Sequence, residues 1–539
     1  MPEFIYKQCK ASKSHCKIII AQPRRIAALN LWNRLKSSLG EEAVGLKMGG
    51  GVKEGAVSSN ITFVTTGYLV RLLVGNLNIA SYTHIIIDEV HERSVDSDVC
   101  CYFVRELLAS HPTLRVILMS ATMQYQLYRD YFNCAGGDYG DLECMSVGVR
   151  RFPVDVHYAE DLVERCPKAA KQLSQMTSDE FTIREGSVFP TRILQFQYAL
   201  VEHICSDNSN FGRGVLVFVS GMNDITELSE IFAKRNLNKD TLGMFKVYVI
   251  HSEIPLEEQE EAFLPVDPNF VKIVLGTNAA ESSITIPDCD VVICLGAAKS
   301  VQYNKHTHRS MICNNWISKA SANQRAGRTG RVRPGTVYRL YSQKRFDTFD
   351  EHNASEINRV PLQDIIIQLR SVIEQQLSNS QKKRSVVTIL EDLIEPPSME
   401  NVEQSFELLF DAGMIEESSD TANLTQLGRF ASNLSVGVQL SRLIGLGQSL
   451  GLGVEATIIA SAMSQTKSLF CIASPLMEKD PNKLHDTSKR TLLGQQFLDA
   501  GILSEPIMLL RAFFAYEALT DVRRDSWLTN LGFAHVRFR

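Results

Sequence analysis

Two adjacent acidic residues, Asp88 and Glu89, directly follow the apolar run Ile85-Ile86-Ile87. A short run of β-branched apolar residues is typical of a strand buried on both faces of a parallel sheet. Parallel sheets bind their ligands at the carboxyl ends of the strands, which is where this acidic pair falls. One carboxylate there can hold Mg²⁺, and the other can orient or deprotonate an attacking water. An acidic pair alone more often lies in a solvated loop. Further motifs are therefore needed to choose between such a loop and a site for Mg²⁺ and a nucleotide.

A second chemical signal is a segment of one charge sign between Val291 and Phe346. The segment contains no Asp or Glu, although the net charge of the whole chain is −5. Solvated protein surfaces usually mix both signs, so this distribution favours a local binding site for a polyanion. Its basic residues are Lys299, Lys305, Arg309, Lys319, Arg325, Arg328, Arg331, Arg333, Arg339, Lys344 and Arg345.

The elements that must position these residues alternate between strand and helix patterns over the first 346 residues. Strands are predicted at residues 17–20, 61–64, 85–87 and 115–119, and helices at residues 26–39, 68–74 and 99–110. From about Phe152 a second set follows, with strands at residues 214–219, 245–250, 271–275 and 290–295 and a helix at residues 222–235. This alternation predicts parallel α/β layers. Residues 165–192 are polar and irregular, which predicts an inserted loop.

The length of 539 residues is too great for one hydrophobic core, so we expect several domains. The domains predicted are residues 1–150, 151–346, 347–430 and 431–539, of which the last is helical, with glycines at 445, 447, 451 and 453 that allow close helix approach. The sequence contains no run of about 18 apolar residues, so no membrane span is predicted. The twelve cysteines include no Cys-x-x-Cys pair, which indicates reduced, intracellular thiols and leaves nucleus or cytoplasm open.

The motifs at the predicted strand ends together resemble those of a known family, the DEAH-box (DEAH/RHA) RNA helicases of superfamily 2. The resemblance to motifs Ia, Ib, II, III, V and VI is carried, in order, by Gln22-Pro-Arg-Arg, Thr65-Thr-Gly, Asp88-Glu-Val-His, Ser120-Ala-Thr, Gly276-Thr-Asn-Ala-Ala-Glu-Ser-Ser-Ile-Thr-Ile-Pro and Gln324-Arg-Ala-Gly-Arg-Thr-Gly-Arg. It implies an α/β fold with two RecA-like parallel-sheet lobes, a degenerate winged-helix domain and a ratchet-like helical bundle. Pro2-Glu-Phe-Ile-Tyr and Cys16-Lys-Ile-Ile-Ile also resemble the Tudor-containing, Spindle-E-like subgroup, although this chain contains no Tudor domain.

The resemblance implies hydrolysis of ATP or another NTP with Mg²⁺. Asp88 and Glu89 are implied at the metal and the attacking water, and His91 as the link to the second lobe. The second lobe is implied to supply Gln324, Arg328 and Arg331 to the γ-phosphate, the two arginines acting as arginine fingers. The remaining nucleotide-site residues implied are Ser120 and Thr122, which connect hydrolysis to domain movement, and Arg34 and Phe263, which stack on the base.

The resemblance also implies 3′-to-5′ movement along RNA and the remodelling of duplexes or RNA–protein complexes. Its implied phosphate contacts are Arg24, Arg25, Thr65, Thr66, Thr277 and Asn278, and Arg333 is a further candidate. Backbone contacts of this kind position a strand without reading its sequence. Residues 299–318 are implied to form a β-hairpin, with its turn near residues 304–307, that acts as a wedge at the duplex junction. G-patch-type proteins are implied as activating partners, and a membrane is not.

The sequence departs from the family pattern at the P-loop, at Ser220-Gly221 and at its C-terminal end. The P-loop, Gly-x-x-x-x-Gly-Lys-Ser/Thr, does not occur in this sequence, and Ser220-Gly221 stands where relatives usually carry Pro-Gly. We expect the sequence to be truncated before the P-loop and, after Phe538, before an OB-fold. Upstream coding sequence with a P-loop would bear out this expectation. The alternative is a catalytically inactive RNA-binding or scaffold protein.

Overall fold

The computed structural model describes residues 1–49, 53–55, 59–74, 81–122, 124–133, 143–145, 152–164, 166–174, 193–207, 210–237, 243–251, 254, 259–281, 286, 288–304, 309–377, 385–434, 436–465, 467–471 and 480–538. The chain divides into two compact units. Unit 1 comprises residues 1–360 and 389–397, and unit 2 comprises residues 361–388 and 398–539.

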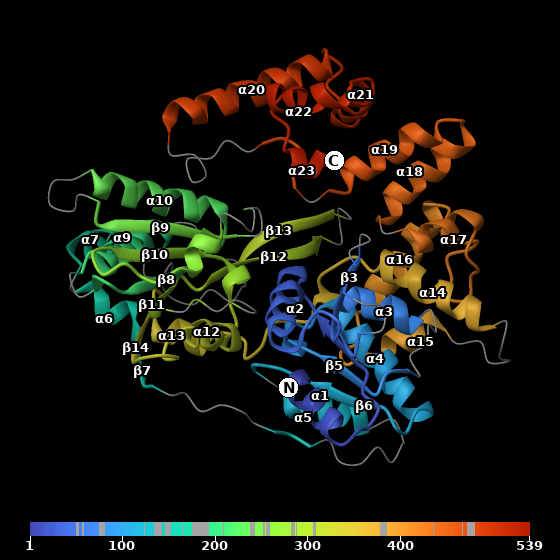
Figure 1. Cartoon of the computed structure of the whole chain (residues 1–539), viewed down its shortest axis with the longest axis horizontal. Coiled ribbons are helices and arrows are strands. Elements are labelled where there is room, and N and C mark those ends of the chain that lie inside the picture. Colours follow the sequence, from blue (N-terminus) through green and yellow to red (C-terminus); the bar gives the residue numbers. More distant parts are fainter. Residues whose placement is uncertain are drawn as a thin grey trace. The chain divides into compact units, whose positions relative to one another are not determined.

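The first sheet of unit 1 has six strands in the order β3-β2-β4-β1-β5-β6 (Figure 1). Their bounds are β1 Ile18–Gln22, β2 Val44–Lys47, β3 Lys53–Glu54, β4 Ile61–Thr65, β5 His84–Ile87 and β6 Arg115–Leu118. All neighbours are parallel except β2 and β3. All residues of β1 and β5 are buried, as the apolar runs predict, whereas those of the edge strand β6 are only half-buried or exposed.

Helices pack on this sheet according to the alternation of side chains along its strands. Ile18 and Ile20 of β1 share a cluster with Trp32 and Leu35 of α2 (Arg25–Leu39), against which Ile5 of α1 (Pro2–Ala11) also packs. The predicted end of α2 is confirmed, because Gly40 adopts a φ of 89° that favours glycine. The other helices of this lobe are α3 (Thr66–Val74), α4 (Val95–Ser110) and α5 (Tyr125–Asn133).

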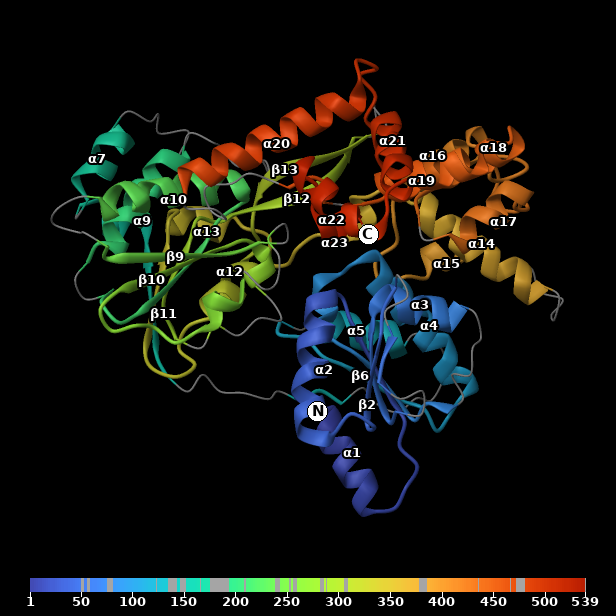
Figure 2. The same ribbon diagram turned by 45° about the horizontal axis from the view of Figure 1, so that its top comes forward.

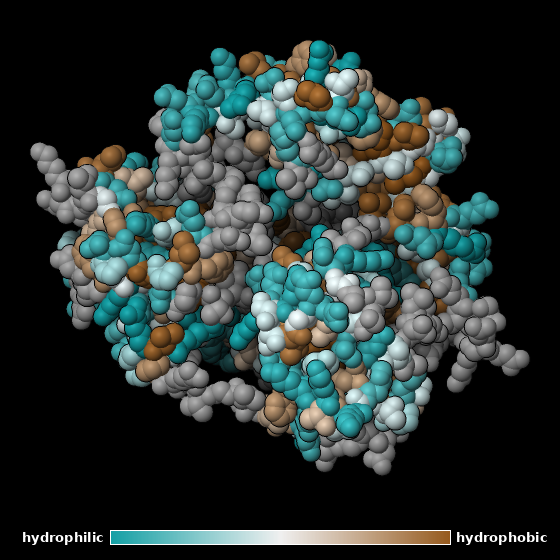
Figure 3. Space-filling model, in the orientation of Figure 1, coloured by the Kyte–Doolittle hydropathy of each residue, from teal (hydrophilic) through white to brown (hydrophobic). Residues whose placement is uncertain are grey.

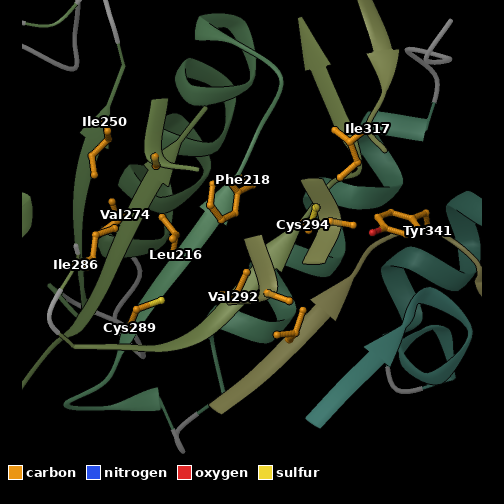
Figure 4. Close-up of a cluster of buried hydrophobic side chains, with 14 of the residues drawn as sticks. Leu216, Phe218, Ile250, Val274, Ile286, Cys289, Val292, Cys294, Ile317 and Tyr341 are labelled. Carbon is orange, nitrogen blue, oxygen red and sulfur yellow. The ribbon is translucent and has the colours of Figure 1, made fainter. Parts of the chain in front are cut away.

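The second sheet of unit 1 is entirely parallel, in the order β7-β14-β11-β8-β10-β9. Its strands are β7 Val154–Tyr158, β8 Gly214–Phe218, β9 Phe245–Ile250, β10 Val271–Gly276, β11 Cys289–Cys294 and β14 Gly335–Arg339. Leu216 and Phe218 of β8 and Val292 of β11 lie in one buried cluster, shown in Figure 4. The helices of this lobe are α6 Ala159–Val163, α7 Pro167–Ser174, α9 Ile193–Cys205, α10 Met222–Asn236, α12 Lys319–Ala326 and α13 Gln343–Asp347.

The hairpin implied at residues 299–318 is present. Strands β12 (Ala297–Asn304) and β13 (Arg309–Trp316) pair antiparallel, from Ala297 opposite Trp316 to Asn304 opposite Arg309. The predicted turn lies largely outside the described residues. Val301 and Ile312 face each other across the strands and are both exposed.

Unit 2 is helical in its described part (Figure 2). Its helices are α14 Gln363–Leu377, α16 Met399–Asp411, α17 Gln426–Asn433, α18 Val438–Ser449, α19 Gly453–Met463, α20 Pro481–Asp499, α21 Glu505–Glu517, α22 Asp521–Asn530 and α23 His535–Phe538, while α15 Val386–Glu391 leads back into unit 1. A Cβ on Gly447 would lie 2.4 Å from that of Ala456, so this glycine does permit close approach of α18 and α19. Hydrophobic side chains gather on the surface of these helices, where Leu446, Leu450 and Val454 are exposed (Figure 3).

The predicted α/β class with a helical C-terminal region is confirmed by these sheets and helices. The expected loop at residues 165–192 was wrong in part, because residues 167–174 form α7 and residues 175–192 lie outside the described part. The winged-helix and ratchet assignments and the domain boundaries stay predictions. Among the described helices, none is long and apolar enough to cross a membrane.

Candidate functional site

The carboxyl edge of the first sheet collects the predicted site residues. Because β1 and β5 are parallel neighbours, Gln22 at the end of β1 lies beside Asp88, which follows β5. The Asp88 amide donates to the Ala21 carbonyl at 3.0 Å, and Gln22 Nε2 donates to Asp88 Oδ2 at 2.6 Å. Gln22 therefore orients the first acid of the pair.

The chain turns sharply after Asp88. Glu89 and Arg93 adopt left-handed φ values of 54° and 49°, and a 3₁₀ turn, Val90–Glu92, lies between them. This conformation costs roughly 1–2 kcal/mol for a residue with a Cβ, so surrounding contacts must hold it. The Val90 amide donates to the Met119 carbonyl at 3.1 Å, and Tyr128 Oη donates to the Val90 carbonyl at 2.9 Å. Backbone strain of this kind is common at functional sites.

The two acids of the turn are poorly compensated. Burial raises the pKa of Asp88, although hydrogen bonds from Gln22 and the Glu89 amide oppose the shift. Burial raises the pKa of Glu89 to about 7, with further repulsion from Asp88 and Glu92 and partial relief from Arg328 and Arg24. Neighbouring carboxylates that resist ionisation fit a site that a cation would stabilise.

A magnesium ion is compatible with this acid pair. No group of three or more His, Cys, Asp or Glu among the described residues could hold a metal by itself. Mg²⁺ usually binds through one or two carboxylates together with water and substrate phosphates, so Asp88 and Glu89 suffice as protein ligands.

His91 connects the acidic turn to α12 of the second lobe. Burial lowers its pKa, which favours the neutral ring. Gln324 Nε2 donates to His91 Nε2, so the ring proton lies on Nδ1, 3.3 Å from Ser120 Oγ and 3.5 Å from Glu89 Oε2. Ser120 Oγ in turn accepts from the Thr122 amide at 3.2 Å. The structure thus brings residues of three predicted motifs into one hydrogen-bonded chain.

The arginines of α12 and the following turn differ in their surroundings. Arg325 is fully buried, pairs with Glu281 at 3.1 Å and lies 5.0 Å from the centre of the Phe218 ring. Arg328 donates to the Glu281 carbonyl, and burial with repulsion from Arg331 lowers its pKa to about 10. Residue spacing gave no sign of the Arg325–Glu281 pair, whose members are 44 positions apart.

Comparison with known proteins shows what the chain is similar to. A family model described as "Helicase conserved C-terminal domain" matches residues 197–333. The chain is 31% identical over 568 residues to the DExH-box ATP-dependent RNA helicase DExH1 of Arabidopsis thaliana, covering 97% of this chain and 53% of the relative. The chain is thus similar to DExH-box ATP-dependent RNA helicases, in line with the resemblance carried by its motifs.

Other relatives carry similar names. A probable ATP-dependent RNA helicase spindle-E of Anopheles gambiae is 30% identical over 501 residues, which are 87% of this chain and 32% of that protein. The ATP-dependent RNA helicase dhx29 of Xenopus laevis is 28% identical over 597 residues, which are 100% of this chain and 41% of that protein. The chain therefore spans about half, or less, of the length of these relatives.

The predicted RNA-contacting residues lie in both lobes. Arg24 pairs with Glu92 at 3.1 Å and donates to the Asn278 carbonyl of the second lobe at 3.0 Å. Arg25 is exposed and donates to the Gly49 carbonyl, whereas Thr66 is buried. Thr65 is half-buried and Thr277 is buried. The structure brings together Arg24 and Asn278, while the RNA contacts themselves stay predictions.

The two residues implied to stack on either side of the base lie in different lobes. Arg34 is exposed on α2, and Phe263 is partly buried against the core of the second sheet. In the described part of the chain, no hydrogen bond or cation–π contact joins them. Their role in binding a base stays a prediction.

The basic segment is not one continuous anion site. Arg333 makes a two-fold ion pair with Asp290, and Lys319 pairs with Glu351. Arg339 is buried and donates to Tyr158 Oη at 2.8 Å. The sequence interpretation overlooked these acids because all of the acidic partners lie outside residues 291–346.

Proposed function

We propose that this chain forms the NTP-hydrolysing and RNA-moving core of an ATP-dependent RNA helicase. The observation that supports this most directly is the hydrogen bond from Gln324 to His91, which joins the acidic turn to α12. Acids come from the first lobe and arginines from the second, so hydrolysis requires both lobes to meet. Opening and closing of the lobes would drive 3′-to-5′ movement and the remodelling of duplexes or RNA–protein complexes.

In the proposed reaction, Asp88 and Glu89 would hold a Mg²⁺ ion. The bound metal supplies neutralisation of phosphate charge. Glu89 orients the attacking water and accepts its proton, as a general base does. Arg328 and Arg331 stabilise the charge that develops on the γ-phosphate. Arg328 remains cationic at neutral pH even with its lowered pKa.

The path from this site to the rest of the lobe runs through His91. A neutral His91 accepts from Gln324 and faces Ser120, so a change at the γ-phosphate would reach both lobes through one ring. Ser120 and Thr122 would then pass the change to β6. Arg34 and Phe263 remain our candidates for stacking on the base.

For RNA, we propose phosphate contacts from Arg24, Arg25, Thr65 and Thr66 of the first lobe and from Thr277 and Asn278 of the second. The contact of Arg24 with Asn278 supports a path that crosses both lobes. The hairpin β12–β13 is the proposed wedge. G-patch-type proteins are proposed activators.

The test compares the full-length protein with Glu89→Gln in RNA-stimulated NTP hydrolysis. Loss of a general base should lower kcat by about 10²–10⁴, while RNA affinity stays unchanged. Glu92→Gln is the matched control, since it removes the same charge from the same turn. If wild-type and Glu89→Gln proteins bind RNA equally and neither hydrolyses NTP above background, the chain is an RNA-binding scaffold instead.

A further inference from the structure

A buried polar network lies behind the acidic turn and is centred on Arg93, its last residue. Arg93 is 4% exposed and binds Asp98 of α4 through two hydrogen bonds of 3.0 Å, from Nε to Oδ1 and from Nη2 to Oδ2. Nη2 also lies 3.3 Å from Glu395 Oε2. Asp98 is 1% exposed, so this ion pair is almost fully removed from water.

The network gathers residues from far along the chain. Ser355 Oγ donates to Asp98 Oδ2 at 3.1 Å. The Glu356 amide donates to the Arg93 carbonyl at 3.0 Å, and Glu356 Oε2 accepts from the Val95 amide at 3.0 Å. Glu356 therefore fixes the backbone of Arg93, while Asp98 and Glu395 fix its side chain.

Residues 389–397, here called the returning segment, supply Glu395. The segment belongs to unit 1, although the residues before and after it belong to unit 2. Its apolar side chains Leu390 and Leu393 are buried. Asp392 pairs with Arg105 of α4, and its carbonyl accepts from Tyr131 Oη at 3.1 Å.

Arg93 can act on the site only through the backbone of the turn. Its side-chain contacts are Asp98 and Glu395, neither of which is a predicted nucleotide residue. Glu89 and Arg93 lie at the two ends of the same short turn, both in left-handed conformations, and His91 lies between them. Non-glycine residues keep such conformations only where the surroundings fix them.

We propose that Arg93 is a positioning residue, and that its ion pairs with Asp98 and Glu395 let the returning segment hold Glu89 and His91 in their working geometry. The catalytic part of this inference rests on the proposed function. The claim that Glu395 stabilises the turn does not require turnover and can be measured separately.

Glu395→Gln is the variant of choice. Removing Arg93 or Asp98 would leave a buried charge without its partner and could unfold the lobe, whereas the Glu395 side chain is 44% exposed. Glu391→Gln is the matched control, because Glu391 is an exposed acid of the same segment. We expect Glu395→Gln to accelerate hydrogen exchange several-fold at the amides of residues 90–93, and Glu391→Gln to leave it unchanged.

The second measurement distinguishes positioning of Glu89 and His91 for catalysis from mere stabilisation of the turn. In RNA-stimulated hydrolysis, Glu395→Gln should lower kcat several-fold with an unchanged KM for NTP, and Glu395→Asp should restore part of the loss. Unchanged hydrogen exchange overturns the inference, as does faster exchange with a wild-type kcat. If the wild-type protein does not hydrolyse NTP, the proposed function fails, and the exchange measurement alone decides whether Glu395 holds the turn.

Discussion

The acidic turn after β5 and the arginine-bearing helix α12 differ in whether their buried charges have partners of opposite charge. In the turn, Asp88 and Glu89 lie beside each other in partly buried positions, and both have raised pKa values. In α12, Arg325 is completely buried, yet it pairs with Glu281 and its pKa is raised, which favours the charged form. Both regions are thus shielded from water, Arg325 more completely than the acids, and Arg325 has a compensating partner in Glu281.

The difference separates charges that stabilise the fold from charges available to a ligand. Arg325 and Arg328 are three residues apart, and burial shifts the pKa of Arg328 downward, to about 10. Arg325 pairs with Glu281 of its own lobe, whereas Arg328 and Glu89 are stabilised in part by each other across the two lobes. We therefore expect substitutions of Arg325 to act on stability and substitutions of Arg328 to act on catalysis.

The largest expected effect is that of Arg328→Ala on hydrolysis. An arginine at the γ-phosphate is worth about 10³–10⁵ in rate, so kcat should fall by at least about 10³ in an RNA-stimulated assay. Arg333→Ala is the control, because Arg333 belongs to the same basic segment but pairs with Asp290. Equal losses in both variants would mean that position in the segment, rather than access to the phosphate, explains the effect.

The next effect concerns the buried ion pair. Arg325→Met leaves Glu281 buried without its cation and should lower the free energy of unfolding by about 3–5 kcal/mol, measured by urea unfolding. Arg331→Met, at an exposed position, should change it by no more than about 0.5 kcal/mol. Adding Glu281→Gln to Arg325→Met should recover part of the loss, because the uncompensated charge is then gone. Additive losses would show that the two residues are not coupled.

The sequence predicted the elements well because their apolar patterns are local. The run Ile85–Ile87 became a fully buried strand, and the predicted strand at residues 245–250 has those bounds. Parallel strand order then placed Gln22 against Asp88. The partners of Arg325, Arg333 and Arg93 could not be read in this way, because an ion pair between distant residues leaves no periodic pattern.

The role of Phe263 also cannot be read from local sequence. The family resemblance marks it as a base-stacking residue, whereas the structure packs it partly against the second core. One aromatic side chain can serve either purpose, and local sequence does not distinguish them. Asp88 differs from Phe263 in this respect, because a residue that directly follows a parallel strand must lie at the ligand-binding edge of the sheet.

A third prediction uses the pH dependence of stability. The pKa of Glu89 is about 7 in the folded protein, against about 4.3 in an unfolded chain. Between these values the folded state holds the extra proton, so the contribution of Glu89 to stability is present below about pH 4 and is lost as pH rises to about 7. Glu89→Gln should therefore increase stability at pH 8 by roughly 2–3 kcal/mol more than at pH 5.

This prediction is checked by thermal unfolding from pH 5 to pH 8 without divalent cations. Glu391→Gln, at an exposed position, should show no such pH dependence. If Glu89→Gln shifts the unfolding temperature equally at both ends of the range, the acids of the turn are compensated after all, and the contrast with α12 disappears.

The smallest expected effect compares the contacts of Arg24 and Arg333. Arg24 joins Glu92 of its own lobe and the Asn278 carbonyl of the second lobe, whereas Arg333 pairs only within its own lobe. If Arg24 binds a phosphate, Arg24→Gln should reduce the slope of log affinity against log salt for single-stranded RNA by about 1. Arg333→Gln should leave the slope unchanged, because the ion pair of Arg333 lies within the second lobe and away from the proposed path across both lobes. A reduced slope in Arg333→Gln alone would reverse the assignment and return the basic segment to the RNA path.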